Sequence, residues 1–329
     1  MAARIDRRML IAGGAGLFGT LVLPRGSQAQ DGFPSRPITI VCPYAAGATT
    51  DTISRIIAQG LAQELPGSVV VENRAGAGGN IGSAAVANAA PDGHTLLLGA
   101  MGPLAINGAL YPKLGFDPLK DFAPLAFAAS VPLALVVSPK LKLNSLPDLL
   151  QALKKEADGT SYASAGSGTP MHLAGELFAK ATGTKLVHVA YRGSAPAIND
   201  VVAGHVPFMF DALVNVASQV QGGTLKALAT TAAERPALFK DVPTLKEAGY
   251  DVVVSGWYGF LAPAATPEPI RQKLAVAMAR VITRDDVRKK LAELGSDTVD
   301  PSPAAFRQLI ESETARWQPL VRSLGLKAE

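Results

Sequence analysis

The sequence predicts an α/β protein built from two modules. Strand and helix patterns alternate from Ile38 to Ala100 and again from Asn144 to Thr231, an order typical of βαβ units with parallel strands. Roughly three hundred residues follow an amino-terminal leader, which is more than one hydrophobic core ordinarily holds. We therefore expect two α/β domains.

The first module begins with the apolar strand Ile38–Cys42. Isoleucine and leucine at helical spacing after Asp51 predict a helix, which Pro66–Gly67 ends. Apolar runs at Val69–Glu72 and Thr95–Leu98 predict two further strands with a helix between them. Continuous apolar strands of this kind are typical of parallel sheets that helices cover on both faces.

The second module repeats the alternation. Two apolar runs, Phe122–Ala129 and Leu133–Val137, predict strands that leave the first sheet and enter the second. Asn144 or Ser145 is expected to cap the first helix beyond them, and two further helices are expected at Pro170–Ala181 and Ala195–Ala203. The expected strands lie around Tyr162 and at Lys185–Ala190, Val206–Phe210 and Leu225–Thr231.

The chain is expected to cross back to the first module at Asp251–Leu261. The apolar stripe of the last helix, from Phe306 to Leu324, indicates packing against that module. The predicted domains are therefore residues 30–131 with 255–329, and residues 132–254. Two crossings form a hinge, and we expect the domains to close over a ligand in the cleft between them.

The first 29 residues have the pattern of a signal peptide. Arg4, Arg7 and Arg8 precede the apolar run Met9–Leu23, and small residues around Ala29 suit a signal peptidase. The arginine pair fits both a twin-arginine and an ordinary secretion signal. The apolar run is too short to span a membrane comfortably. We therefore expect cleavage after Ala29 and a periplasmic protein.

Charge and cysteine content exclude several classes of protein. Cleavage would remove four arginines and one aspartate, so the net charge of +4 would fall to +1. No basic, aromatic-rich face remains to bind nucleic acid. The lone Cys42 cannot form an internal disulfide and is expected to be a small buried residue. We expect a monomer without a cofactor.

Three loops rich in small residues follow predicted strands and precede predicted helices, at Pro43–Asp51, Arg74–Gly82 and Ala165–Pro170. Small residues let backbone N–H groups approach a ligand, and the helix dipole favours an anion. The candidate ligand-binding residues in and around these loops are Tyr44, Gly47, Ala48, Thr49, Asp51, Gly79, Asn80, Ser164, Gly166, Ser167, Gly168, Thr169 and His172.

Within the third loop, we expect the backbone N–H groups of Gly166–Thr169 and the hydroxyls of Ser167 and Thr169 to bind a ligand carboxylate. Asp51 has two interpretations. It either satisfies N–H groups at the start of its helix or contacts the ligand.

The second module adds candidates at two strand ends. Arg192, between Tyr191 and Gly193, is either a carboxylate clamp or a surface arginine. Asp211 follows an apolar strand and is hard to bury without a partner, which favours a position in the cleft.

Catalytic and metal motifs are weak. The glycine pattern Gly14–Gly19 lies in the signal peptide with no strand before it, and no GxSxG nucleophile motif occurs. His172 and Glu176 share a helix face, but two ligands are too few for a metal site. An alternative function is a periplasmic hydrolase or isomerase acting on a small acid, with Asp51 or His172 as the base.

Taken together, the motifs PYAAGATTD, VENRAGAGGNIG, PDGHTLLLG, GSGTPMHLAGELF, HVAYRGSAPAINDVVAGHV and GWYGFLAPAATP resemble those of the Bug, or TctC-like, family of extracytoplasmic solute receptors of tripartite tricarboxylate transporters. The resemblance covers the mature chain. It implies a two-domain periplasmic-binding-protein (Venus-flytrap) fold that binds a small carboxylated metabolite, often through bridging waters. It also implies delivery to a membrane permease or a sensor protein. One departure is Ala48, where family members commonly have a second glycine, and this constricts the expected site.

Overall fold

The computed structural model describes residues 32–47, 49–296 and 299–327. The predicted signal peptide and the candidate Ala48 lie outside the described residues. Pro34–Glu329 form one compact unit, and its strands have the order β2-β1-β3-β9-β4-β7-β5-β6, with β8 paired to β4.

The first group of elements is the parallel module that the sequence predicts. Its strands are β1 (Ile38–Cys42), β2 (Val69–Asn73) and β3 (Thr95–Ala100), and its helices are α1 (Thr49–Glu64) and α2 (Asn80–Ala87). β1 lies between β2 and β3 and runs parallel to both. Ile53, Ile57 and Leu61 of α1 are buried, as the apolar stripe indicated, and Ile56 is partly buried.

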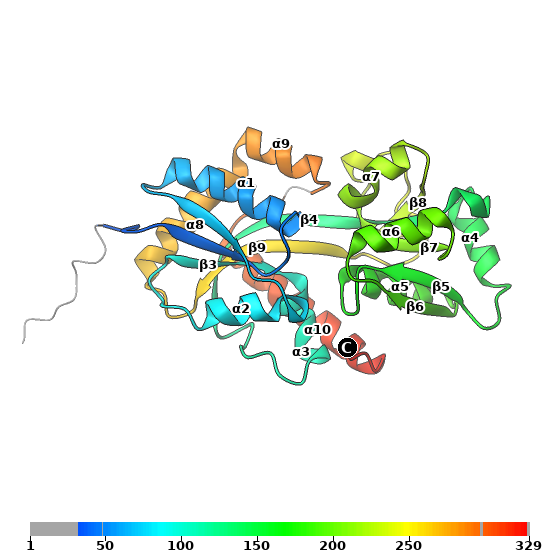
Figure 1. Ribbon diagram of the computed structural model, residues 1–329, viewed down its shortest axis with the longest axis horizontal. Coiled ribbons are helices and arrows are strands. Elements are labelled where there is room, and N and C mark those ends of the chain that lie inside the picture. Colours follow the sequence, from blue (N-terminus) through cyan, green and yellow to red (C-terminus); the bar gives the residue numbers. More distant parts are fainter. Residues whose placement is uncertain (1–31, 48, 297–298, 328–329) are drawn as a thin grey trace, which may run out of the picture. The chain divides into compact units, whose positions relative to one another are not determined.

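The connection between the two groups differs from the prediction. Phe122–Val137 form one continuous strand, β4, in place of two. Pro132 interrupts the apolar pattern but not the strand. β4 pairs antiparallel with β9 (Ser255–Pro263) as far as Pro132, and with β7 and β8 from Leu133 onward. β4 and β9 thus run from one group of elements to the other (Figure 1).

The second group follows the predicted alternation and adds a helix. Its strands are β5 (Thr160–Ser164), β6 (Leu186–Ala190), β7 (Phe208–Ala212) and β8 (Lys226–Thr230). Its helices are α4 (Leu146–Leu153), α5 (Pro170–Thr182), α6 (Ser194–Ala203) and α7 (Leu213–Gln221). β5 is parallel to β6 and β7. The sequence did not predict α7, because it begins directly after β7 without a side-chain cap or a turn residue.

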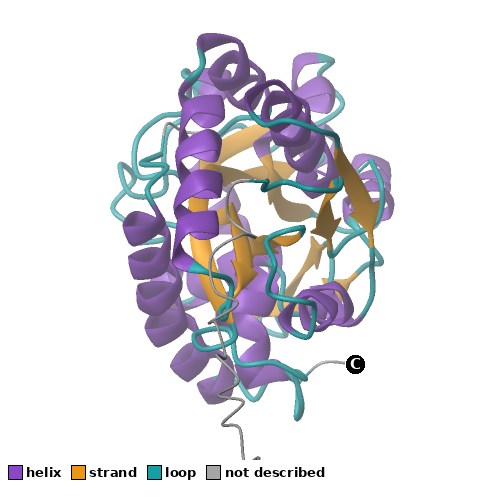
Figure 2. Ribbon diagram, turned by 90° about the vertical axis from the view of Figure 1, so that its left-hand side faces the viewer, coloured by secondary structure: helices purple, strands orange, loops and turns teal. Residues whose placement is uncertain are grey.

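The carboxyl-terminal helices are α8 (Glu268–Thr283), α9 (Asp285–Glu293) and α10 (Pro303–Ser323). In α10, Phe306, Ile310, Trp317 and Val321 are buried, which confirms that its apolar stripe packs in the core. A turn of π-helix, Gly102–Ile106, and the short helix α3 (Asn107–Leu110) follow β3 and were not predicted. Figure 2 shows helices on both sides of the strands.

Cys42 is a buried free cysteine in the middle of this core, as predicted. No helix among the described residues is long and apolar enough to cross a membrane. β4 changes its pairing partner between Pro132 and Leu133. This is where the sequence placed a domain boundary, and we propose the predicted boundaries on that ground.

Candidate functional site

A cavity of about 660 Å³ lies within the compact unit, and loops from both groups of elements line it. The first group contributes Gly47 and Thr49 from the loop before α1, and Asn107 and Tyr111 from the region of α3. Gly78 and Gly102 also line this side, and neither adds a side chain, so the backbone is accessible there.

The second group lines the opposite side of the cavity. Its contributions are the loop from Ala165 to Met171, the start of α6 at Gly193–Ala195, and Asn215 on α7. The two crossing strands complete the wall with Leu133 and Tyr258. The cavity therefore depends on segments up to two hundred residues apart in sequence, which β4 and β9 bring together.

None of the described residues that line the cavity carries a charged side chain. Helices α1 and α5 each contribute a residue from their first turn to its wall, namely Thr49 and Pro170. The positive ends of helix dipoles stabilise an anion without a fixed cation. The cavity thus has a polarity suited to a carboxylate.

Several residues that line the cavity have a hydroxyl without a hydrogen-bond partner among the described residues. They are Thr49, Thr50, Tyr111, Ser167 and Tyr258. Burial raises the pKa of both tyrosines, and with the nearby charge of Asp211 it brings the pKa of Tyr258 to about 12. Both phenols therefore stay protonated at neutral pH and are able to donate hydrogen bonds.

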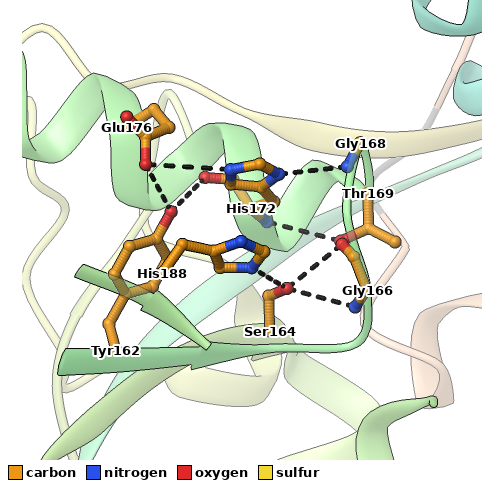
Figure 3. Close-up of polar contacts among 8 residues, drawn as sticks. All are labelled: Tyr162, Ser164, Gly166, Gly168, Thr169, His172, Glu176 and His188. Carbon is orange, nitrogen blue, oxygen red and sulfur yellow. Dashed lines mark hydrogen bonds and ion pairs between the residues drawn. The ribbon is translucent and has the colours of Figure 1, made fainter. Parts of the chain in front are cut away.

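The loop Gly166–Thr169 is organised differently from our expectation (Figure 3). The Gly168 N–H donates to His172 Nδ1 at 3.0 Å, and the Thr169 N–H donates to the Gly166 carbonyl at 3.3 Å. The Thr169 hydroxyl donates to the same carbonyl at 2.7 Å and caps α5 by accepting the His172 N–H. Gly166 donates its N–H to Ser164. Within this loop, Ser167 is the described residue whose hydroxyl and N–H stay available to a ligand.

Two stacked histidines hold this loop in place. The rings of His172 and His188 lie 3.7 Å apart at an angle of 6°. His188 Nε2 contacts Ser164 Oγ at 2.6 Å, and His172 Nε2 faces Glu176 Oε1 at 3.7 Å. Burial lowers the pKa of His172 to about 3, with a further contribution from His188, whose own pKa burial lowers to about 4. Both rings are neutral at physiological pH, so His172 Nδ1 can accept the Gly168 N–H.

The carboxylate of Asp51 is hydrogen-bonded to other groups of the protein. It accepts hydrogen bonds from the Gly47 N–H, the Arg55 guanidinium and the Asn73 amide. Burial acts to raise the pKa of Asp51, but these hydrogen bonds and the Arg55 charge outweigh it and lower that pKa. Asp51 does not line the cavity. Its contacts support the helix-start interpretation, and they fix Gly47, which does line it.

Other sequence candidates lie behind the wall. Gly79 and Asn80 do not line the cavity, but Asn80 Oδ1 accepts a hydrogen bond from Asn107, which does. Ser164, Gly166 and His172 likewise support the loop without lining the cavity. The candidates that line it are Tyr44, Gly47, Thr49, Ser167, Gly168, Thr169 and Gly193.

Arg192, after β6, lies at the surface, whereas Asp211, near the end of β7, is buried. Arg192 is exposed and does not line the cavity, so its geometry favours the surface interpretation. The Tyr191 hydroxyl donates to Asp200 at 2.6 Å. Asp211 is fully buried. Its Oδ1 atom accepts hydrogen bonds from the Asn215 amide and the Ser194 hydroxyl. Burial raises the pKa of Asp211 to about 6.

Sequence reasoning missed Asn107, Tyr111, Asn215 and Tyr258 as lining residues. Three of them lie in or directly after helices that the sequence did not predict, namely Asn107 and Tyr111 at α3 and Asn215 on α7. Tyr258 lies in the predicted return crossing, where alternation along the strand was the signal that could have found it. The described residues contain no group of three His, Cys, Asp or Glu residues that could hold a metal ion.

Ser167→Ala is expected to weaken binding of the ligand by at least about tenfold. The change removes one hydrogen bond to a charged group, worth roughly 1.5–3 kcal/mol, and it leaves the loop's internal hydrogen bonds intact. Calorimetric titration measures the effect. Ser161→Ala, on β5 and outside the cavity, is the matched control. Equal affinity of the two variants would contradict the role of Ser167.

Comparison with known proteins agrees with this geometry. Residues 53–326 match the family described as tripartite tricarboxylate transporter family receptor, TctC. The chain belongs to this receptor family. A Pseudomonas relative named for the tcbD-tcbE intergenic region is 38% identical over 99% of this receptor and 97% of its own length. Protein BugT of Bordetella pertussis is 36% identical over 91% of the receptor and 92% of its own length.

Solved structures are also similar. R. palustris Rpa4515, described with adipate, is 33% identical with a TM-score of 0.83, and the match covers 90% of the receptor and 99% of that chain. MatC from Rhodopseudomonas palustris, described with bound malate, is 36% identical with a TM-score of 0.78 over 88% and 100% of the two chains. The receptor therefore has the two-domain periplasmic-binding-protein fold. It is a solute-binding receptor and not an enzyme, which sets aside the hydrolase and isomerase alternative.

Proposed function

We propose that the receptor captures a small carboxylate in the 660 Å³ cavity and delivers it for uptake or sensing. The observation that carries this proposal is the lining of the cavity. Helix starts, glycine backbone and unpartnered hydroxyls surround it, and no cationic side chain of the described residues lines it. Such a site binds an anion through hydrogen bonds and dipoles, and it leaves the ligand releasable.

The energetics are sufficient for a receptor. A hydrogen bond to a charged group contributes roughly 1.5–3 kcal/mol, and micromolar affinity corresponds to about 8 kcal/mol. Bonds from Thr49, Ser167 and one phenol would provide much of that. Apolar contact with residues such as Met101 and Leu133 would provide the rest.

The relatives support the class of ligand and the setting. Two of the similar solved structures are those of Rpa4515 with adipate and of MatC with bound malate. We infer for this receptor an export signal cleaved after Ala29, a periplasmic location and a monomeric state. Its partner is then a permease of the tripartite tricarboxylate type or a sensor protein.

Capture is proposed to proceed by closure of the two domains. Gly168 from the second group lies against Leu110 of the first, where a Cβ on Gly168 would come within 2.1 Å of Leu110 Cδ1. Ligand that bridges the two walls stabilises this close approach. X-ray scattering is expected to give a smaller radius of gyration with saturating ligand. An unchanged scattering profile would argue against closure.

Native mass spectrometry of gently purified protein tests the function itself. We expect a co-purified organic acid that is released unchanged on denaturation and that rebinds in calorimetric titration. Conversion of this acid into a product, or failure of any carboxylate to bind, would overturn the proposal.

A further inference from the structure

The wall formed by β7, α6 and α7 has a fixed pattern of hydrogen-bond donors and acceptors. Its centre is Asp211, which is fully buried. Asp211 Oδ1 accepts the Ala212 N–H at 2.7 Å, so this oxygen acts as an acceptor. Any other polar atom that contacts Oδ1 must therefore present a hydrogen to it.

Two side chains from the cavity wall present those hydrogens. The Asn215 Nδ2 amide donates to Asp211 Oδ1 at 2.8 Å, and the Ser194 hydroxyl donates to it at 2.9 Å. The same Nδ2 group lies 3.1 Å from Ser194 Oγ. These contacts direct the amide nitrogen of Asn215 at Asp211 and Ser194, and the bond to Asp211 uses the hydroxyl hydrogen of Ser194.

What remains for a ligand at this point is a pair of acceptors. Both Asn215 and Ser194 line the cavity. Asn215 retains its carbonyl oxygen Oδ1, and Ser194 retains a lone pair. The amide cannot turn over to offer its N–H₂ group, because its oxygen would then face Asp211 Oδ1.

The charge behind the wall has the same sign as these acceptors. Asp211 Oδ2 is buried without a hydrogen-bond partner among the described residues. Among the described residues, the hydrogen-bond donors to Asp211 are Asn215, Ser194 and the Ala212 N–H, and all three are neutral. A second carboxylate placed here would meet two acceptors and a buried negative charge, whereas a hydroxyl or ammonium group would donate to both acceptors.

We propose that the ligand is a carboxylate that carries a hydrogen-bond donor, a hydroxyl or ammonium group, placed against Asn215 Oδ1 and Ser194 Oγ. This inference rests on the proposed carboxylate-binding function and narrows its ligand class. The carboxylate then lies toward Thr49 and Ser167, whose hydroxyls have no hydrogen-bond partner within the part of the chain that the structure describes. The other lining amides, Asn199 and Gln219, have no hydrogen bond with Asp211 among the described residues, and Gln219 Oε1 accepts one from the Ser218 hydroxyl.

The test is a matched series of acids with one chain length and different end groups. Hexanoate, 6-hydroxyhexanoate, 6-aminohexanoate and adipate are titrated calorimetrically at pH 7.5, together with the corresponding four-carbon series that ends in succinate. The hydroxyl and ammonium acids are expected to bind at least about tenfold more tightly than the methyl and carboxylate acids of the same length, or about 1.4 kcal/mol. The ratio between the two donor acids distinguishes a neutral from a cationic donor.

Two variants test whether Asn215 and Ser194 cause the preference for acids with a hydroxyl or ammonium group. Asn215→Leu removes the carbonyl acceptor and is expected to abolish the preference for a donor group while methyl-terminated acids still bind. Ser194→Ala removes the other acceptor and provides the same test if the first variant does not fold. Gln221→Ala, exposed on the same helix and outside the cavity, is the matched control and should keep the preference.

The outcomes separate this inference from the function on which it rests. Adipate or succinate binding as tightly as the donor acids would overturn the inference and leave a carboxylate receptor in place. Release from the purified protein of a native acid without a hydroxyl or amino group would do the same. If no acid binds and none is released, the proposed function and the inference both fail.

Discussion

Lowering the pH from 7 to 4 is expected to reduce the free energy of unfolding of this receptor by about 4 kcal/mol. The cause is the stacked pair His172 and His188, which the fold holds neutral. Their pKa values are about 3 and about 4 in the folded protein, against about 6.5 for an unfolded histidine.

The direction follows from which state binds protons. Below about pH 6.5 the unfolded chain protonates both rings while the folded protein does not, so stability falls as the pH falls. At pH 4 this amounts to about 3 kcal/mol for each ring. Asp211 acts in the opposite direction, because its pKa is raised to about 6 and the folded state takes up its proton first. At pH 4 the protonation of Asp211 therefore offsets about 2 kcal/mol of the stability that the two histidines lose.

Denaturant unfolding at a series of pH values measures the effect, with the buried Trp257 and Trp317 as fluorescence probes. The double variant His172→Asn with His188→Gln keeps acceptors near Nδ1 and Nε2 but cannot titrate. It should lose the fall in stability between pH 6.5 and 4 and show instead the opposite contribution of Asp211, a rise of about 2 kcal/mol. His205→Asn, at an exposed histidine, is the control. A double variant with the wild-type slope would show that other groups are responsible.

Gly168→Ala is expected to weaken ligand binding at least tenfold, or about 1.4 kcal/mol. Gly168 has φ +74°, and an added Cβ would lie 2.1 Å from Leu110 Cδ1. The positive φ alone costs an alanine about 1–2 kcal/mol of folding stability. The contact with Leu110 obstructs the approach of the two walls, so affinity falls in addition.

Two variants separate the causes. Gly223→Ala has nearly the same φ, +70°, with nothing within 4 Å of its Cβ. It should lose similar stability and keep wild-type affinity. Leu110→Val combined with Gly168→Ala removes the obstructing methyl and should recover part of the affinity without recovering stability. Wild-type affinity of Gly168→Ala would show that ligand binding does not require the close approach of Gly168 to Leu110, and it would argue against closure at this contact.

Local sequence patterns were sufficient to predict most elements. The β1–α1–β2 and β5–α5–β6 segments have apolar runs and helical spacing that depend on neighbours within a few residues, and their bounds agree closely with the structure. The prediction was wrong where local signals conflict with sheet pairing. Pro132 suggested a break in β4, yet pairing with β9 on one side and β7 on the other keeps the strand continuous.

The sequence by itself determined the fold class, the family resemblance and the three small-residue loops, because each depends on composition and on spacing along the chain. Only the tertiary structure decided how the residues of those loops are used. The N–H groups of Gly168 and Thr169 are hydrogen-bonded to His172 and to the Gly166 carbonyl, so they are not available to a ligand. Asn215 directs its amide nitrogen at the buried Asp211, which leaves its oxygen for a ligand. A hydrogen-bond donor is available to a ligand only if no buried acceptor of the protein uses it. Which acceptors lie near a donor depends on residues that are distant in sequence, so local sequence patterns do not determine it.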